Sequence, residues 1–441
     1  MNEDLSQQTA TSEEMPIAPS PASPMSDLDS YYSNRKLMWR NVSWITFGHF
    51  GTALSMTIVE PLMNLRLKAV GVSESSIGLL TSANLWAVSF LVMYFSWKSD
   101  HCTSRLGRRT PYVLLSLPFI SIALILFPFF KEAWVLIGLM IFYYFFNDMK
   151  ASTYPLLGID CVSREVLARV SGIVTVMLSI AGFLSSRLGA QMADVSQTRV
   201  FIIATVAMAG TTLIALYWIK EPPIYHPAEG KFNLLAPIKV ACQDKRILVL
   251  MLAVALFNAF PMIFTTWVWF YAKAKLSLTI GGTGAAISWG MLLRIIVSYP
   301  AGWLIDRFGS YVALCLEWSL MLVLILCSSH VTNSNGLIVL MVIFSLLTPF
   351  QVAGDTILWK TMDKADTGSY TATVAFIRNF CTGTMIFLSG YIIKWTGSYV
   401  LAFWFGFIVS SVAVIVFFVY RYLMRNGGTA AIATPAAVNG V

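Results

Sequence analysis

Six polar side chains fall near the centres of six long apolar stretches of this sequence. Polar residues inside such stretches are costly to bury and commonly mark a function. Counted at 1.5 Å per residue, each lies roughly 12–17 Å from one end of its stretch, near the middle of a ~30 Å hydrocarbon layer. We therefore expect one binding level, formed by His49, Asp148, Asn258, Arg294, Gln351 and Arg378.

The chemistry of these residues suggests their roles. Asp148 can exchange a proton, and His49 could share that proton, bind a ligand, or simply pack between helices. Arg294 and Arg378 stay charged, so they either neutralise Asp148 or bind an anionic or hydroxyl-rich ligand through their planar guanidinium groups. Lys150 follows two residues after Asp148, about 200° around a helix, and is interpreted as structural or as extending its ammonium to the membrane surface.

Aromatic and amide side chains complete the candidate site. Tyr144 lies one turn from the aspartate on the same helix face. It could stack on a sugar ring or an apolar ligand, as could Trp267 or Trp269. Asn258 and Gln351 could bind a ligand or join neighbouring helices by hydrogen bonds.

Two loops repeat an Asp that is followed by Arg and Gly. One loop is SDHCTSRLGRR (99–109), and the other is GWLIDRFGS (302–310). An Asp at a helix end can cap the next helix and pair with Arg. Asp160, with Arg164 and Arg169, forms a third group of this kind. We predict that these groups either form a latch that closes one side of the molecule or simply anchor the loops. The candidate gating residues are Asp100, Arg105, Gly107, Arg108, Arg109, Asp160, Arg164, Arg169, Gly302, Asp306, Arg307 and Gly309.

A second possible gate lies at the opposite side. Glu60 and Arg187 both fall roughly 26–28 Å from the side that carries the loop clusters. They could form an outer ion pair. Equally, each could anchor its own helix at the interface.

The composition shows which elements must position these residues. Of the 441 residues, 57% are hydrophobic and 12% are charged, whereas a soluble domain carries about 25% charge. This excludes an ordinary soluble protein and a largely disordered one. The pI near 9.1 would suit nucleic acid, but the bases are not clustered, so we expect no nucleic-acid partner. A polytopic membrane protein remains.

The hydropathy pattern predicts an all-α membrane protein with twelve transmembrane helices in two pseudo-symmetric six-helix bundles. A polar segment at 220–246 separates the sixth stretch from the seventh. The expected organisation is a disordered tail at 1–34, bundles at 35–219 and 247–425, the linker, and a disordered tail at 426–441. The expected spans are 41–65, 74–97, 110–130, 133–157, 167–192, 198–219, 247–272, 279–304, 311–329, 335–359, 369–393 and 398–420.

The distribution of basic residues predicts the orientation. The connecting segments on the side of the termini hold most of the Lys and Arg residues that lie outside the spans. By the positive-inside rule, both termini of this integral membrane protein are expected in the cytoplasm.

Motifs for other chemistry are missing. The six cysteines form no Cys-x-x-Cys pair and the four histidines are scattered, so we expect no metal and no bound cofactor. The sequence contains no Gly-x-x-x-x-Gly-Lys-Ser/Thr motif, so we expect no ATP binding. It contains no His-Glu-x-x-His or Gly-x-Ser-x-Gly motif, so we expect no enzymatic activity.

The loop motifs resemble those of the major facilitator superfamily, whose signature is roughly Gly-x-x-x-Asp-Arg-x-Gly-Arg-Arg. The copy at 302–310 fits well, while the copy at 99–109 has Ser96 in place of the opening Gly and a longer Asp-to-Arg spacing. That longer form, with Pro111 and Tyr112 after the two arginines, looks like the glycoside–cation symporters and sucrose transporters. The segment TYPLLGIDCVSREVLARVSG (153–172) is also similar to theirs.

This resemblance implies a secondary transporter that works by alternating access. Its partners would be the lipid bilayer, a small-molecule substrate and a coupling cation, either a proton or sodium. The loop motifs favour a sugar or glycoside substrate. Two midplane arginines favour the alternative of an organic anion such as a uronate or another carboxylate. A membrane sensor that binds a ligand without transporting it is a third possibility.

Overall fold

The computed structural model describes residues 31, 34–162, 167–222, 245–351, 354, 357 and 367–426. Every regular element among them is helical, which confirms the predicted all-α class. The predicted tails and linker lie mostly outside the described residues. The first group of helices comprises α2 (Arg35–Ala69), α3 (Glu74–Asp100), α4 (Thr110–Leu126), η1 (Phe127–Phe129), α5 (Ala133–Asp160), α6 (Leu167–Leu184), η2 (Ser185–Gly189), α7 (Ala190–Val195) and α8 (Gln197–Trp218).

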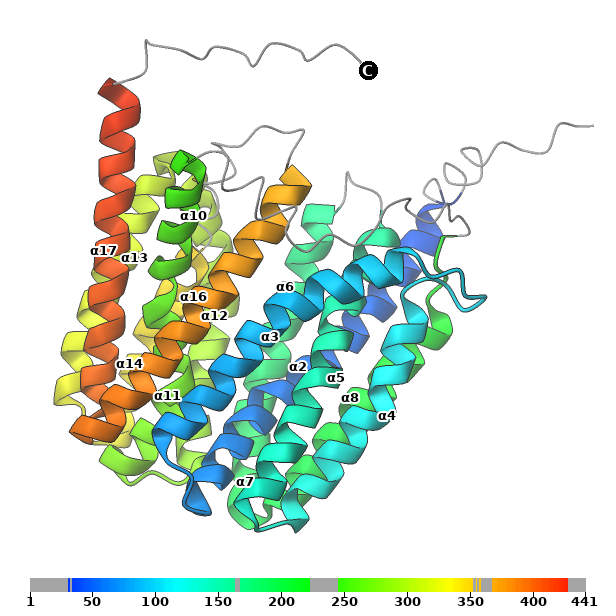
Figure 1. Cartoon of the computed structure of the whole chain (residues 1–441), viewed down its shortest axis with the longest axis horizontal. Helices are drawn as coiled ribbons and strands as arrows, with labels where there is room; N and C mark the ends of the chain where they lie inside the picture. The colour runs from blue at the N-terminus through cyan, green and yellow to red at the C-terminus, as the bar shows by residue number, and fades with distance from the viewer. Residues whose placement is uncertain are drawn as a thin grey trace, which may run out of the picture.

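The second group follows the linker. In Figure 1 these helices, coloured from green to red, stand beside the blue-to-green helices of the first group. The second group comprises α10 (Lys245–Phe257), α11 (Ala259–Leu276), α12 (Ile280–Phe308), α13 (Ser310–His330), α14 (Ser334–Leu347), η3 (Thr348–Gln351), α16 (Thr367–Thr396) and α17 (Tyr399–Asn426).

Most of these helices are long and apolar enough to cross a bilayer. Eleven spans meet that criterion within the described residues. The remaining predicted span, 133–157, corresponds to α5, which is 28 residues long but carries the polar residues Asn147, Asp148 and Lys150. Side chains cap several exposed helix starts, and these caps satisfy backbone N–H groups that have no partner inside the helix. The capping residues are Ser73, Ser196, Thr279 and Asn333.

Two spans contain breaks in the regular helix. The seventh is divided at Asn258, where Ser410 of α17 accepts a hydrogen bond from the Phe260 amide at 3.2 Å and donates to the Phe257 carbonyl at 2.9 Å. The fifth contains the π-helical turn η2, where the Ser185 hydroxyl donates to the Leu54 carbonyl of α2 at 2.7 Å. Side chains of neighbouring helices therefore satisfy backbone groups at each break.

Both groups begin and end on the same side. The side at which α2 begins and α17 ends is called the termini side, and the opposite side is called the far side (Figure 1). On the far side, the Tyr399 hydroxyl donates to Glu74 Oε1 at 3.3 Å and the Gly281 amide donates to Asp194 Oδ2 at 2.9 Å. Both bonds join the two groups.

Small residues let helices of the two groups approach closely. The Ser82 hydroxyl of α3 donates to the Gly383 carbonyl of α16 at 2.6 Å. A Cβ added at Gly284 of α12 would strike the Ser186 carbonyl and the Ala190 side chain. Small residues serve this role commonly in membrane helices, where close backbone approach provides the attraction. The closest junctions of the two groups thus lie along α3–α16 and along α12 with η2 and α7.

Candidate functional site

A cavity of about 220 Å³ lies between the two groups of helices. We call it the central cavity. Glu60 and Arg294 are its two charged residues, one from each group, and no ion pair within 4 Å joins them. A carboxylate from one group of helices and a guanidinium from the other therefore line the same largely apolar cavity. The polar and aromatic part of the lining is Thr57, Glu60, Thr265, Trp269, Arg294, Phe344, Ser345 and Thr348.

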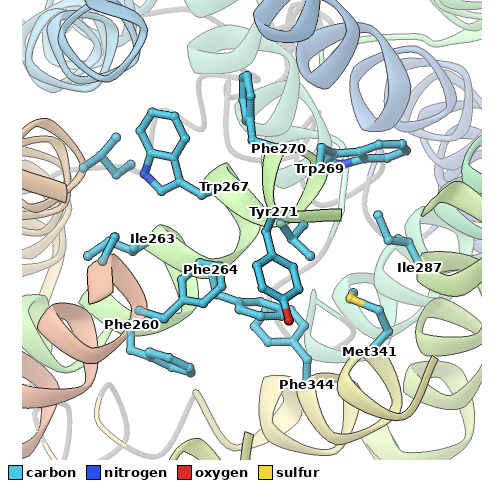
Figure 2. Close-up of a cluster of buried hydrophobic side chains, with 14 of the residues drawn as sticks. Phe260, Ile263, Phe264, Trp267, Trp269, Phe270, Tyr271, Ile287, Met341 and Phe344 are labelled. Atoms are coloured by element: carbon cyan, nitrogen blue, oxygen red, sulfur yellow. The ribbon is translucent and has the colours of Figure 1, made fainter. Parts of the chain in front are cut away.

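The two tryptophans of α11 have different environments. Trp269 lines the central cavity, on the side of Ile287 and Met341 (Figure 2). Trp267 lies on the opposite side of α11, is fully buried, and donates its indole N–H to the Ser389 hydroxyl at 2.8 Å. Residues two apart lie about 200° around a helix, so only one of the pair can face the cavity. Of the two predicted tryptophans, Trp269 therefore lines the central cavity and Trp267 does not.

Asp148 belongs to an acidic and aromatic cluster. Its side chain is only 4% exposed and interacts electrostatically with Glu60 of α2. Tyr143 and Tyr144, both buried, interact with both carboxylates. One oxygen of Asp148, Oδ2, accepts no hydrogen bond. The structure thus brings together Tyr144 and Asp148 as expected from their spacing, and adds Glu60 as their neighbour.

Glu60 and Arg187 form no ion pair in this structure. Glu60 instead lines the central cavity, whereas Arg187 is half-buried in the π-helical turn η2. The expected outer gate is therefore not formed in this conformation.

A second cavity, of about 260 Å³, lies within the first group between α2, α5 and α6. We call it the lysine cavity, because Lys150 is 1% exposed and lines it. The Lys150 ammonium donates to the Thr52 hydroxyl at 2.7 Å, and the Thr52 hydroxyl donates to the Gly48 carbonyl at 2.9 Å. Met56 borders this cavity and the central cavity. The two cavities are therefore neighbours.

His49 also lines the lysine cavity. Its ring packs edge-on against Tyr154 with the centroids 4.8 Å apart. Lys150 was not among the predicted site residues, yet it lies beside His49 in this cavity. The signal was present, because an ionisable residue inside an apolar stretch is the same feature that selected Asp148.

Three other predicted residues line neither cavity. Asn258 lies at the break in the seventh span, where its side chain donates to the Val254 carbonyl at 2.9 Å. Gln351 ends η3 one turn after Thr348 and is half-buried. Arg378 is half-buried on α16. Their binding roles stay predictions.

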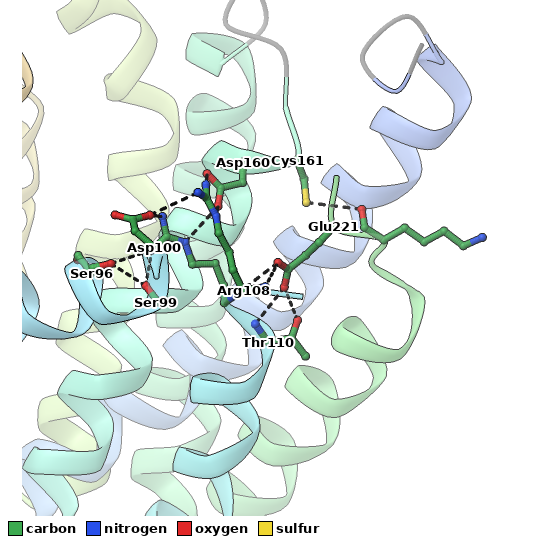
Figure 3. A network of polar contacts seen from close by, with 10 residues as sticks. Ser96, Ser99, Asp100, Arg108, Thr110, Asp160, Cys161 and Glu221 are labelled. Carbon is green, nitrogen blue, oxygen red and sulfur yellow. Dashed lines mark hydrogen bonds and ion pairs between the residues drawn. The ribbon is translucent and has the colours of Figure 1, made fainter. Parts of the chain in front are cut away.

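The loop cluster of the first group is built around a buried arginine, Arg109. Figure 3 shows its partners Asp100 and Asp160 close to Arg108. The Arg109 side chain is only 4% exposed, and it contacts Asp100 Oδ1 at 2.5 Å and Asp160 Oδ2 at 3.1 Å. Arg108 contacts Asp160 Oδ1 at 2.5 Å. These ion pairs join the ends of α3, α4 and α5, so the cluster stabilises the first group of helices. The hydrogen bonds that join the two groups, by contrast, lie on the far side.

Glu221 completes the cluster and was not predicted. Its carboxylate accepts hydrogen bonds from the Arg108 amide at 2.8 Å, the Thr110 amide at 3.0 Å and the Thr110 hydroxyl at 2.6 Å (Figure 3). It therefore caps α4, whose first turn has no side-chain cap of its own. The available signal was an acid directly after the sixth apolar stretch, close to a helix start with two arginines.

The remaining loop residues differ in their surroundings. Arg105 is exposed and forms no ion pair with any described residue. Arg307 lies 5.0 Å above the Trp303 ring, a cation–π contact. Gly309 has φ 87° between α12 and α13, a conformation that favours glycine. Arg164 lies outside the described residues, as do the side chains of Arg169 and Asp306 and the surroundings of Gly302.

We expect Gly107→Ala to destabilise the protein by about 2–3 kcal/mol, since left-handed strain costs about 1–2 kcal/mol and lost hydrogen bonds add to it. Gly107 has φ 103°, and an added Cβ would lie 2.5 Å from both Glu221 carboxylate oxygens. The carboxylate would have to leave the start of α4. Thermal unfolding of the purified protein measures the effect.

Gly71→Ala is the matched control for this prediction. Gly71 has a similar φ of 91°, but an added Cβ would meet nothing within 4 Å. It therefore reports the backbone strain alone. An equal loss of stability in both variants would show that the Glu221 contact contributes nothing.

Comparison with known proteins agrees with this architecture. The family model described as Major Facilitator Superfamily matches residues 45–350. No curated protein sequence matches the chain significantly. Three similar solved structures share its fold at low sequence identity.

The nucleoside transporter NupG has a TM-score of 0.70 at 11% identity over 88% of this chain and 99% of its own. The human organic anion transporter MFSD10 has 0.59 at 14% over 87% of this chain and 99% of its own. A bacterial homologue of the human lysosomal transporter Spinster has 0.59 at 12% over 88% of this chain and 95% of its own. With more than half of its length matched by the family model, this multi-pass membrane protein belongs to the Major Facilitator Superfamily of transporters.

Proposed function

We propose that the protein is a cation-coupled symporter of a small hydroxyl-rich solute, a sugar or glycoside. The observation that carries this proposal is the central cavity, which Glu60 and Arg294 both line without forming an ion pair. Alternating access requires a site that both groups of helices contribute to, so that their relative motion exposes it to either side.

The polar lining suits hydroxyl groups. The Glu60 carboxylate accepts hydrogen bonds and the Arg294 guanidinium donates them. Together they can bind the hydrogen of one solute hydroxyl and the oxygen of a neighbouring one. Thr265 and Ser345 add hydroxyls at the same cavity, and Trp269 offers a flat aromatic face for a sugar ring. The cavity volume of about 220 Å³ is below the ~300–1,000 Å³ of drug-sized ligand sites. A cavity of this volume suits a small solute.

Coupling is assigned to the acidic cluster. Glu60 and Asp148 are two carboxylates that interact with each other, and no basic group of a described residue lies within 4 Å of either. A proton or sodium ion bound there would reduce their mutual repulsion. Because Glu60 also lines the central cavity, cation binding and solute binding would share one residue. We favour the proton, since a buried carboxylate binds one without needing a full ligand shell.

The orientation follows from the charges. We place both termini in the cytoplasm on the basis of the positive-inside rule. The far side then faces outward. The hydrogen bonds from Tyr399 to Glu74 and from Gly281 to Asp194 lie there, which is the arrangement of an inward-facing conformation.

An organic anion is the second candidate. No carboxylate of a described residue lies within 4 Å of Arg294, so the central cavity holds a cation that no described acid pairs with. This observation favours a carboxylate or uronate over a neutral sugar. A sensor that binds a ligand without moving it differs from both in its lack of flux.

Reconstituted proteoliposomes test the proposed function. With the interior alkaline relative to the medium, we expect labelled solute to accumulate above its external concentration, and we expect collapse of the proton gradient to release it. A panel of glycosides, nucleosides and uronates defines the solute. Accumulation with a sodium gradient alone would replace the proton by sodium. Saturable binding of a ligand without any flux would overturn transport and favour a sensor.

A further inference from the structure

Lys150 is a buried cation that the proposed coupling and solute contacts do not use. Its side chain is 1% exposed, so its ammonium does not extend to water or to the lipid headgroups. Within the described residues, its hydrogen-bond partner is the Thr52 hydroxyl at 2.7 Å, and no carboxylate lies within 4 Å. An ammonium has three N–H donors, so two remain for another partner.

Asp148 cannot supply the missing charge. It lies two residues before Lys150 on α5, about 200° around the helix. The structure places Asp148 beside Glu60 and the tyrosines, while Lys150 lines the lysine cavity. Burying an unpaired charge costs several kcal/mol. In its charged form, Lys150 therefore needs a complementary anion that the described residues do not supply.

The lysine cavity has further donors around the ammonium. His49 and Asn147 both line it, and neither makes a hydrogen bond to a described residue. His49 is close enough to Lys150 to interact with it electrostatically. Thr52 is held in place because its own hydroxyl donates to the Gly48 carbonyl. Lys150, His49 and Asn147 thus provide three donor side chains around a cavity of about 260 Å³ that no described acid lines.

We propose that the lysine cavity is an anion subsite that takes the carboxylate group of the transported solute, with Lys150 as its counter-ion. A carboxylate carries one negative charge, which one lysine balances, whereas a phosphate monoester carries about −1.5 to −2. Met56 borders the lysine cavity and the central cavity. One solute can therefore place its carboxylate at Lys150 and its hydroxyl-bearing part near Glu60 and Arg294. The substrate class is a small hydroxylated carboxylic acid. This assignment rests on the proposed function.

Binding by the full-length protein in nanodiscs, with no gradient, tests the subsite. The probes are glucuronate, glucuronamide, glucose and glucose 6-phosphate, which share a sugar ring and differ in charge. We expect glucuronate to bind at least tenfold more tightly than the amide or glucose, and more tightly than the phosphate. Lys150→Met is expected to remove the preference for the acid over the amide, and Lys150→Arg is expected to keep it.

Lys98→Met is the matched control. Lys98 is an exposed lysine of α3 that donates to the Tyr94 hydroxyl, so its loss is expected to leave the preference unchanged. Should Lys150→Met not fold, Thr52→Val serves instead, because it removes the hydroxyl that positions the ammonium and is expected to lower glucuronate affinity several-fold.

The outcomes separate the subsite from transport. Equal affinity for the acid and the amide in the wild type, tighter binding of the phosphate, or no saturable binding of glucuronate would overturn the subsite. A full preference in Lys150→Met would also overturn it. A carboxylate preference without gradient-driven flux would leave the subsite standing and reject the proposed transport. Gradient-driven uptake of neutral sugars without a carboxylate preference would support the proposed transport and reject the subsite.

Discussion

Proteoliposomes that contain Asp148→Asn are expected to lose proton-driven accumulation of the solute. A pH difference of two units can drive about 100-fold accumulation for one proton per solute, since each unit corresponds to 1.36 kcal/mol. Asparagine keeps the shape of the side chain but cannot carry the proton. Accumulation should therefore fall to the level of simple equilibration. Uptake of labelled solute under an imposed proton gradient measures this change.

Exchange of labelled for unlabelled solute at equal pH separates coupling from solute binding. Because Asp148 is not among the residues that line the central cavity, exchange should continue in the asparagine variant. Glu132→Gln is the control, since Glu132 is an exposed acid directly before the same helix. It should accumulate solute like the wild type. Accumulation by Asp148→Asn at the wild-type level would show that the coupling proton binds elsewhere.

The second large effect is expected for Arg109→Met. Breaking a buried ion pair by removing one partner costs about 3–5 kcal/mol, and we expect about 3 kcal/mol because Asp100 is partly exposed. Arg109 also donates to the Ser96 carbonyl at 3.1 Å and to the Ser99 hydroxyl. Its loss leaves these acceptors without that donor. Denaturant unfolding of the purified protein measures the loss of stability.

Two further variants test the cause. Arg105→Met removes an exposed arginine of the same loop that has no ion pair with a described residue, so unfolding should not change. The double variant Arg109→Met with Asp100→Asn should recover part of the loss, because one unpaired carboxylate is removed as well. An Arg109→Met protein as stable as the wild type would mean that the cluster does not hold α3, α4 and α5 together.

Hydropathy alone determined the class of this protein. Apolar stretches of about 20 residues can satisfy their backbone inside a bilayer only as helices, so the spans follow from composition. The same cost of burial identified Asp148 and Arg294, because a charge within such a stretch stands out in the sequence. The Arg and Asp residues at 100–109 were likewise visible, and the structure pairs Asp100 with Arg108 and Arg109.

Helix rotation was not available from the sequence. Trp267 and Trp269 are the same residue type at nearly the same depth. The rotation of α11 about its axis nevertheless places Trp267 against Ser389 and Trp269 at the central cavity. In the same way, depth alone could not show that Lys150 would line a cavity beside His49. The sequence gives the distance along a helix, whereas the packing of its neighbours sets the direction of each side chain.

Contacts between distant segments were decided only by the tertiary structure. Glu60 meets Asp148 and shares a cavity with Arg294, although these residues lie on three different helices in two groups. Glu221 caps α4 from more than a hundred residues away. Burial in a bilayer is a property of each stretch by itself, so the sequence determined it. Which residues of different helices come into contact depends on how all the helices pack together. Only the tertiary structure therefore determined the site.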